Sequence, residues 1–451
     1  MNHSFEETLD GICIVQSNIK LNCEDKIGSF MTDQDYDLVV NNDTDFYAPA
    51  SFGNVQNEDN IIFKFRKNVF TEEQQRGAYE GLVGAATPTQ NRGKAAGPKE
   101  GRLNNRDWVT DEQSEILQYF IDSTTSLLDD DPIETIRRKY AGNNSGARGL
   151  VWLRSQIADA GYNYDTFFTD KVEELSAMTP EEASKHASLL KKTFISDTTY
   201  ANQVLSGIAG FFDRYPRIPY GRATSYTRDN YETFKKCYPF MVQLADKFKE
   251  LLPRRHGVQE REANKLDSRF RVAGQQTPFT TITVNKNFRT AAHRDAGDLN
   301  EGFSNLTVVA NDKEWQGGYL VLPEYRVAIN IRPGDLLLIN NHDGIHGNTE
   351  MLPPEGKTVE EMERISLVCY FREKMLELGS WEYEKARYDY VESRRKDSSH
   401  PLWHKLWNGV SPSMWDNQEW YDYLESELGE TVLQTYHPEA MSNNSLEEFF
   451  V

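Results

Sequence analysis

The sequence has few cysteines, and none of them is spaced for a disulfide framework or a zinc cluster. Cys13, Cys23, Cys237 and Cys369 are the only four in 451 residues. Small disulfide-stabilised domains and zinc ribbons bring their cysteines close together in the sequence. We therefore expect reduced thiols that pack as structural residues.

Long apolar runs are also missing. No stretch of about eighteen apolar residues occurs, which is the length that a membrane-spanning helix needs. The first residues, Met1 to Glu7, are acidic, and no basic region leads into an apolar segment, so no secretory signal peptide is predicted. We expect an intracellular protein, in the cytoplasm or nucleus, that is not secreted and has no membrane partner.

Positive charge is in short supply. Lys and Arg number 50 against 70 Asp and Glu, which gives a net charge of −20. Nucleic-acid binding depends largely on neutralising phosphates, so the chain as a whole would repel a polyanion. A substrate smaller than a nucleic acid therefore stays an alternative. Short basic clusters could form a local cationic path or could be solvated helix faces. They are Arg137–Lys139, Lys191–Lys192, Arg254–Arg255, and Arg261 with Arg269 and Arg271.

What the sequence does have is a globular composition and a series of short strand-like runs. Hydrophobic residues make up 38% and aromatic residues 12% of the chain, and neither repeats nor low-complexity tracts occur. Runs of β-forming residues are separated by turn signals such as Pro333-Gly334-Asp335. They cover residues 279–284, 305–309, 318–322, 326–331, 335–339 and 365–371. Such strands favour a sandwich or barrel, and a jelly roll can hold a metal at its open mouth.

Two histidines and an aspartate beside these runs are spaced like a non-haem iron site. His293-Arg294-Asp295 is followed about fifty residues later by His346. Two imidazoles and one carboxylate on one face of an iron leave three positions open, enough for a bidentate co-substrate and dioxygen. We predict His293, Asp295 and His346 as metal ligands and catalytic centre.

His342 competes with His346 for the distal position, because both lie in one loop after a predicted strand. We prefer His346, since the number of residues between it and Arg364 lets the next strand bring that arginine behind the iron. The following Gly347 permits close backbone approach, and Asn348 could support the imidazole by a hydrogen bond. His342 would then be a loop residue.

Arg364 and Ser366 form a predicted co-substrate site. Arginine presents a planar fork that matches a carboxylate, and a serine two residues later on a strand points to the same side. This pair would bind the far carboxylate of 2-oxoglutarate. Asn285 and Asn287, on the strand before His293, could touch the same ligand or could be turn and ladder residues.

At these residues the chain resembles the TET/JBP family of iron- and 2-oxoglutarate-dependent dioxygenases, and it is more similar to the thymine-hydroxylase branch of the J-binding proteins. The resemblance covers about residues 210 to 375. It rests on Phe279–Asn285 with Asn287–His293, on Gly297-Asp298 with Gly302–Val308, and on His346–Thr349. It implies that the family's iron ligands fall on His293, Asp295 and His346, and its 2-oxoglutarate arginine on Arg364.

The resemblance also implies an activity. The enzyme would oxidise the 5-methyl group of thymine or 5-methylcytosine in DNA to hydroxymethyl, using Fe(II), 2-oxoglutarate and O2, with ascorbate as a stimulant. A base inside a duplex cannot reach a buried iron, so it would be flipped out or already single-stranded. The iron motif does not choose between the two bases. A hydroxylase of a protein side chain or small metabolite and a catalytically inactive DNA-binding relative stay open as alternatives.

For the whole chain we expect an α+β fold, with a double-stranded β-helix (jelly-roll) core buttressed by helices and with helical N- and C-terminal extensions. The predicted parts are a loop-rich segment with some strand (1–105), a mainly helical support region (106–275), the jelly-roll core (276–375) and a Trp-rich helical region (376–451). Capping boxes at Thr110 and Thr179 predict helix starts, and Asp229 starts another helix. The basic loop Asn91–Pro98 could approach phosphate or be a mobile connection, and the tail's tryptophans could stack on bases or pack a helical cap.

Overall fold

The computed structural model describes residues 2–49, 57–90, 92–98, 163, 166–179, 182, 202–213, 221–295, 297–310 and 314–396. Contacts divide the chain into two compact units. The first unit consists of residues 1–100, 201–213 and 221–381, and the second of residues 101–200, 214–220 and 382–451. The four-part division expected from the sequence stays a prediction.

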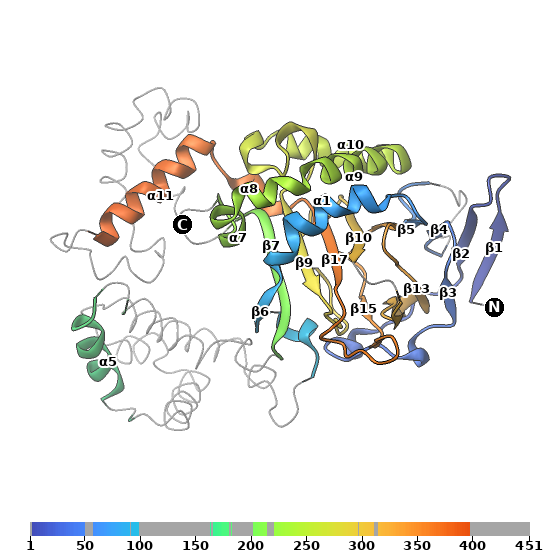
Figure 1. Ribbon diagram of the computed structural model, residues 1–451, viewed down its shortest axis with the longest axis horizontal. Coiled ribbons are helices and arrows are strands. Elements are labelled where there is room, and N and C mark those ends of the chain that lie inside the picture. The colour runs from blue at the N-terminus through green and yellow to red at the C-terminus, as the bar shows by residue number, and fades with distance from the viewer. Residues whose placement is uncertain are drawn as a thin grey trace, which may run out of the picture. The chain divides into compact units, whose positions relative to one another are not determined.

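The described elements are mostly short strands and helices (Figure 1). The strands are β1 His3–Glu7, β2 Cys13–Ser17, β3 Leu38–Val40, β4 Thr44–Tyr47, β5 Ile61–Arg66, β6 Thr87–Thr89, β7 Val204–Asp213, β8 Gly221–Ala223, β9 Thr281–Lys286, β10 Ser304–Ala310, β11 Gln316–Gly317, β12 Leu320–Leu322, β13 Val327–Ile329, β14 Leu336–Ile339, β15 Gly347–Asn348, β16 Met351–Leu352 and β17 Arg364–Tyr370. The α-helices are α1 Glu72–Leu82, α5 Phe167–Ser176, α7 Ser225–Asp229, α8 Tyr231–Phe234, α9 Tyr238–Leu251, α10 Pro253–Ala263 and α11 Trp381–Lys396. The 3-10 helices are η1 Glu24–Lys26, η2 Asp33–Asp35, η3 Val83–Ala85, η4 Gly93–Ala96, η7 Lys235–Cys237, η8 Ser268–Phe270, η9 Gly274–Gln276, η10 Pro323–Tyr325 and η11 Glu373–Glu377.

A large mixed sheet forms the centre of the first unit. Its strand order is β1-β2-β4-β5-β14-β10-β17-β9-β7-β6, with β8 paired to β7. Helices α1 and α9 lie over one face of this sheet (Figure 1) and bury apolar side chains against it. The α+β content agrees with the sequence-based prediction.

The two faces of the sheet follow from the alternation of side chains along each strand. On β17 the odd-numbered residues Ile365, Leu367 and Cys369 belong to the core under the helices. The even-numbered ones line a cavity on the opposite face: Arg364, Ser366, Val368 and Tyr370. Polar residues at the odd-numbered positions would therefore disrupt the core under the helices. Large apolar residues at the even-numbered positions would fill the cavity.

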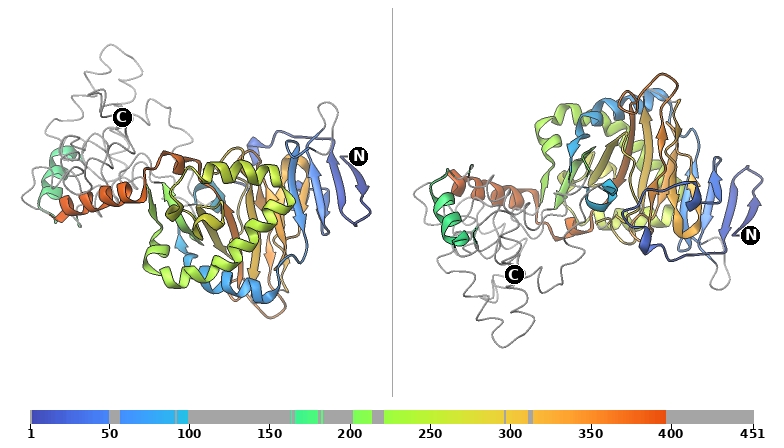
Figure 2. Two further views of the ribbon diagram at one scale, coloured as in Figure 1. Left: turned by 90° about the horizontal axis from the view of Figure 1, so that it is seen from above. Right: turned by 90° about the horizontal axis from the view of Figure 1, so that it is seen from below.

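A second, four-stranded sheet covers that opposite face. Its order is β15-β12-β13-β3, and strands β11 and β16 form a separate pair. The two larger sheets share one apolar core, in which Phe63 and Leu337 of the large sheet pack with Leu320 and Ile329 of the small one. Residues of both sheets, among them Ser366 of β17 and Leu320 of β12, line the cavity. Figure 2 shows the sheets from two further sides.

The N-terminal segment contributes to both sheets. Strand β5 pairs antiparallel with β14, and β3 runs parallel to β13. Loops of the same segment hold the chain that leads to His293: Ala292 N donates to Ser29 O at 2.9 Å, and Ala291 N donates to Ala95 O at 2.8 Å.

The predicted helix starts have different outcomes. Thr179 and Glu182 make the reciprocal hydrogen bonds of a capping box, whereas Thr110 lies outside the described residues. The helix predicted to start at Asp229 starts two residues later: α8, which carries Phe234, begins at Tyr231 after the N-cap Asn230. Asp229 itself is the last residue of α7, whose N-cap Thr224 accepts from Thr227 N. Within the described ranges, none of the helices is long and apolar enough to cross a membrane.

Candidate active site

Two histidines lie opposite each other at the end of the small sheet. His293 N donates to His346 O and His346 N donates to His293 O, each at 2.9 Å, in an isolated antiparallel bridge. Their ring centroids are 4.4 Å apart. A Cβ on Gly347 would lie 2.9 Å from Ala292 N, so glycine is what lets the two chains approach this closely.

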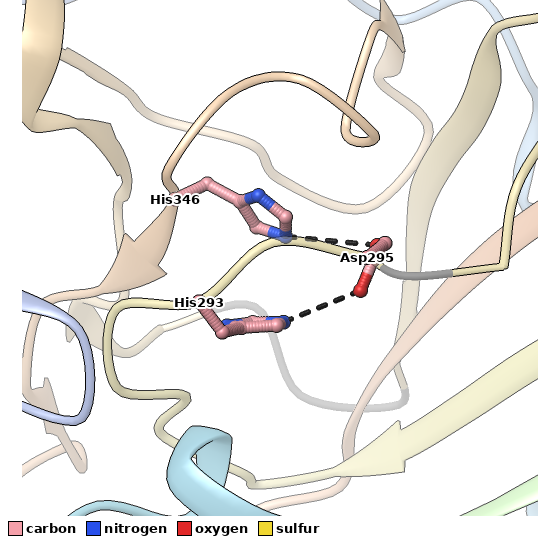
Figure 3. A group of neighbouring side chains, drawn as sticks. All are labelled: His293, Asp295 and His346. Carbon is pink, nitrogen blue, oxygen red and sulfur yellow. Dashed lines mark ion pairs between the residues drawn. The ribbon is translucent and has the colours of Figure 1, made fainter. Parts of the chain in front are cut away.

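The carboxylate of Asp295 faces both imidazoles (Figure 3). Its Oδ1 lies 3.4 Å from Nε2 of His293, and its Oδ2 lies 3.6 Å from Nε2 of His346. The potential ligand atoms of the three residues all lie within 4.8 Å of one another. Over the described residues, this is the one group of His, Cys, Asp and Glu side chains with a geometry for holding a metal ion.

Main-chain carbonyls orient both rings. Nδ1 of His293 lies 2.8 Å from Ala291 O, and Nδ1 of His346 lies 3.0 Å from Gly344 O. A carbonyl oxygen only accepts hydrogen bonds, so each Nδ1 carries the proton and donates it. Each Nε2 points toward Asp295: it keeps its lone pair for a metal when the ring is neutral, and it can donate to the carboxylate when the ring is protonated.

The electrostatics of the three groups also suit a cation. Burial and the charge of His293 lower the pKa of His346 to about 4, so this imidazole is neutral at pH 7. Burial raises the pKa of Asp295, but the hydrogen bond with His293 and the histidine charges outweigh it and hold the pKa at about 2. Burial lowers the pKa of His293, and Asp295 more than offsets this, so the pKa is raised. The carboxylate thus favours positive charge between the side chains.

His342 lies apart from this group. Its Nδ1 is buried and has no hydrogen-bond partner among the described residues. The side chain lines a small separate pocket beside Phe303 and not the cavity. The distal histidine that the fold brings to Asp295 is His346.

Arg364 lies at the start of β17 with its side chain in the cavity. The residue is 3% exposed, and its Nε has no hydrogen-bond partner within the described part of the chain. Its guanidinium carbon lies 5.8 Å from the centroid of the Trp315 ring, and that of Arg332 lies 5.0 Å from the same centroid. Burial, with the charge of Arg332, lowers the pKa of Arg364 to about 10. A buried guanidinium next to another cation is costly unless an anion binds.

The cavity has a volume of about 430 Å³ and joins the two groups of residues. Ser366 and Asn285 line it beside Arg364, and they are directly paired across β17 and β9. The Oδ1 of Asn285 accepts a hydrogen bond from the hydroxyl of Ser206, which leaves the amide nitrogen available to a ligand.

Asn287 has a different environment. It does not line the cavity, and its Nδ2 donates to the carbonyls of Val359 and Met362. Its Oδ1 accepts from Arg364 N at 3.0 Å. Its amide is therefore used in holding the chain before β17, and this geometry gives no support to a direct co-substrate contact.

Several cavity residues were not predicted from the sequence. Arg92, Asp298, Asn341, Tyr370 and Arg372 line it with the predicted set. Tyr370 could have been found, because it continues the alternation of Arg364 and Ser366 on one strand. Asp298 lies within the family motif that was noted. For Arg92, the sequence offered only a basic loop.

Most arginines of the basic clusters considered as a cationic path make contacts within the protein where they are described, whereas Arg261 is exposed and lines a surface pocket with Arg254 and Arg255. Arg254 and Arg255 bind Asp59 and the backbone of Glu58. Arg269 pairs with Asp267, and Arg271 is buried and donates to Thr277 O. The clusters at 137–139 and 191–192 lie outside the described residues.

The motifs of this site agree with a known family. The family model for the "Oxygenase domain of the 2OGFeDO superfamily" (Tet_JBP) matches residues 207–373. This segment is similar to the oxygenase domains of the Tet/JBP family. The superfamily is that of the Fe(II)- and 2-oxoglutarate-dependent dioxygenases, and the matched residues of the Tet/JBP domain include His293, Asp295, His346 and Arg364.

Curated relatives match over the same part of the chain. "Thymine dioxygenase JBP1-B" of Trypanosoma cruzi (strain CL Brener) is 34% identical over 171 residues, 37% of this chain and 19% of that protein. "Bifunctional helicase and thymine dioxygenase JBP2" of Leishmania infantum is 35% identical over 169 residues, 37% of this chain and 14% of that protein. The matches thus span a fifth or less of these relatives. A solved structure described as "NgTET1 in complex with 5mC DNA" matches 43% of this chain and 67% of that chain, with 17% identity and a TM-score of 0.30.

Proposed function

We propose that this protein is an Fe(II)- and 2-oxoglutarate-dependent dioxygenase that oxidises the 5-methyl group of thymine or 5-methylcytosine in DNA to hydroxymethyl. The observation that carries the proposal is a single cavity that contains both the candidate metal ligands and the candidate 2-oxoglutarate arginine. Two imidazole Nε2 atoms and a carboxylate converge in it, and it is lined by the buried guanidinium of Arg364, whose Nε has no hydrogen-bond partner among the described residues. The substrate is inferred from the relatives that are named thymine dioxygenases.

The proposed fold of the core is a jelly roll, or double-stranded β-helix. Two layers of sheet that share a core and separate around a cavity support it. The ligand-bearing chain crosses between the layers: β9 of the large sheet ends at Lys286, and His293 then pairs with the chain entering β15 of the small one. A metal held there lies at the mouth of the layers and not within the apolar core.

The proposed metal ligands are His293, Asp295 and His346. Two nitrogens and one carboxylate oxygen form the facial set that suits non-haem Fe(II) and leaves positions open. When bound, iron with 2-oxoglutarate and O2 supplies the oxidising power that replaces a hydrogen of the methyl group by hydroxyl. The protein's residues hold the metal, orient the substrates and exclude water. A methyl hydrogen is not acidic, so the chain needs no general base.

The proposed 2-oxoglutarate site is Arg364 with Ser366 and Asn285. The guanidinium would take the distal carboxylate in a fork, which would relieve the cost of burying it beside Arg332. The hydroxyl of Ser366 and the amide of Asn285 lie on the same wall. Asn287 would act through Arg364, because its carboxamide fixes the backbone at that residue.

The remaining part of the cavity would receive a single pyrimidine. A base must leave the stack to reach a recessed iron, so the substrate would be a flipped or single-stranded nucleotide. Because a hydroxylase of protein side chains or small metabolites would use the same metal site, the choice of DNA needs a direct test.

The test is mass spectrometry of nucleosides released from DNA after incubation with protein, Fe(II), 2-oxoglutarate and ascorbate. Oligonucleotides containing thymine or 5-methylcytosine, free nucleosides and a peptide pool are compared as substrates. We expect hydroxymethylated pyrimidine in DNA, dependent on 2-oxoglutarate, and none with Asp295→Ala. Oxidation confined to peptides or free nucleosides, or DNA binding without any oxidised base, would contradict the proposal.

A further inference from the structure

The cavity contains a guanidinium that neither the metal site nor the proposed co-substrate site uses. Arg92 lies just after β6, and its side chain lines the cavity wall together with Asp295 and Tyr370. It precedes residues 207–373, the part of the chain that matches the oxygenase domain. The N-terminal segment therefore completes the wall of this cavity.

Tight packing fixes the segment that carries Arg92. Ala95 O accepts from Ala291 N at 2.8 Å, two residues before the first histidine ligand. Ala96 packs against Phe288. Gly97 has a φ of 84°, and a Cβ there would lie 2.2 Å from the ring of Phe30, so no larger residue fits. These contacts hold the backbone three to five residues after Arg92 against the chain that leads to His293.

The three arginines that line the cavity have different environments. Arg372 donates to the buried carboxylate of Asp213 at 2.7 Å. Arg364 lies at the opposite end of β17 from Tyr370, about 20 Å along a strand of this length, where the proposed co-substrate carboxylate would bind. Arg92 is left, and among the described residues no hydrogen-bond or ion-pair partner of its side chain is found. Its guanidinium is a donor that lacks an acceptor.

The chemistry of the substrate supplies that acceptor. In a pyrimidine whose 5-methyl group faces the metal, the ring neighbours of C5 are C4 and C6, and only C4 carries a polar group. Thymine has an oxygen there, an acceptor, whereas 5-methylcytosine has an amino group, a donor. A guanidinium has only donors, so close to the metal ligands it would pair with the first base and oppose the second.

We propose that Arg92 donates a hydrogen bond to O4 of the target base and so makes this site select thymine over 5-methylcytosine. The inference rests on the proposed function, because it concerns the base that the iron site oxidises. It assigns the discrimination to a residue of the N-terminal segment.

The experiment uses the full chain and two single-stranded oligonucleotides that differ only in one thymine or 5-methylcytosine. Arg92→Met removes the donors, and Arg92→Lys keeps a charge without the fork. Lys94→Ala is the matched control, because it removes a positive charge from an exposed position of the same segment. Products are measured by nucleoside mass spectrometry, and the KM for 2-oxoglutarate and substrate-free 2-oxoglutarate turnover are measured in parallel.

We expect the wild type to prefer thymine. In Arg92→Met, kcat/KM for thymine should fall about tenfold to a hundredfold, the loss expected for a hydrogen bond to a charged group, while that for 5-methylcytosine stays or rises. Arg92→Lys should lie between, and Lys94→Ala should match the wild type. The KM for 2-oxoglutarate and substrate-free turnover should not change in any variant, which also shows that each is folded.

Three results would overturn the inference while leaving the proposed function intact. They are a wild-type preference for 5-methylcytosine, an equal loss for both bases in Arg92→Met, and a raised KM for 2-oxoglutarate in that variant, which would assign the guanidinium to the co-substrate. A wild-type protein that oxidises neither base would overturn the proposed function and, with it, the role of Arg92.

Discussion

Replacing Arg364 by methionine should stabilise the protein when 2-oxoglutarate is absent and remove its response to that ligand. The residue is 3% exposed, and burial lowers its pKa from 12.5 to about 10. A shift of this size corresponds to about 3 kcal/mol against the charged form in the fold. At neutral pH the unfolded and folded arginines are both charged, so the cost is fully present. Methionine keeps an apolar stem beside Trp315 and removes the charge, so up to about 3 kcal/mol can be regained.

The assay is thermal unfolding under anaerobic conditions with Fe(II), with and without 2-oxoglutarate. Ligand at a hundred times its Kd stabilises the wild type by about 2.7 kcal/mol, and a domain of a few hundred residues shifts in Tm by about 2–4 °C per kcal/mol. Arg364→Met should unfold at a higher temperature than the wild type without ligand and show no shift with it. Arg364→Lys should keep a smaller shift and raise the KM for 2-oxoglutarate about tenfold or more, because a point charge replaces a fork.

Arg332→Met is the control. Its guanidinium donates to Trp315 O and Gly317 O at 3.0 and 3.3 Å, so its loss should destabilise the protein by about 1–3 kcal/mol, as expected when buried acceptors lose their partner. The reasoning fails if Arg364→Met destabilises the ligand-free protein as much as Arg332→Met does. It also fails if Arg364→Met still responds to 2-oxoglutarate.

Three further predictions concern the metal and the residues around it. In iron titrations His346→Ala should lose stoichiometric binding and His342→Ala should retain it, and the opposite result would reverse the assignment of the distal ligand. Asp295→Ala should abolish product while its Tm stays within a few degrees of the wild type, and measurable turnover would argue against a carboxylate ligand. Asn287→Ala should raise the KM for 2-oxoglutarate several-fold and cost about 1–3 kcal/mol of stability by chemical denaturation, because it breaks three hydrogen bonds to the chain before β17; an unchanged KM would deny it a positioning role.

Much of the core layer could be predicted because its information is local. The alternation of Arg364, Ser366 and Tyr370 with apolar residues sets the two faces of β17 without reference to the rest of the chain. The turn at Gly334 has a φ of 90°, which the Pro-Gly-Asp pattern predicts. The spacing of His293 and Asp295 is equally local. These features depend on the strand period and on residue chemistry.

The preference for His346 over His342 had less local information behind it, only the spacing to Arg364 and the following Gly347. The assignment depends on the bridge between His293 and His346 and on the close approach at Gly347, which join residues far apart in the sequence. The same holds for β5 against β14 and for Arg92 in the cavity wall. Pairing between strands that are hundreds of residues apart leaves no periodic signal in either strand, because the hydrophobic pattern of a strand does not show which strand it pairs with.

Net charge was a poor guide to the ligand for a related reason. The chain carries −20, yet Arg92, Arg364 and Arg372 line the cavity against the carboxyls of Asp295 and Asp298. Burial and the charge of Asp295 raise the pKa of Asp298 well above its usual value, which reduces the negative side further. Buried charges interact far more strongly than those screened by solvent on the surface. The proposed anionic co-substrate would therefore meet a cavity wall in which arginines outnumber charged carboxylates, although the protein as a whole is acidic. A few residues from distant segments set this local balance.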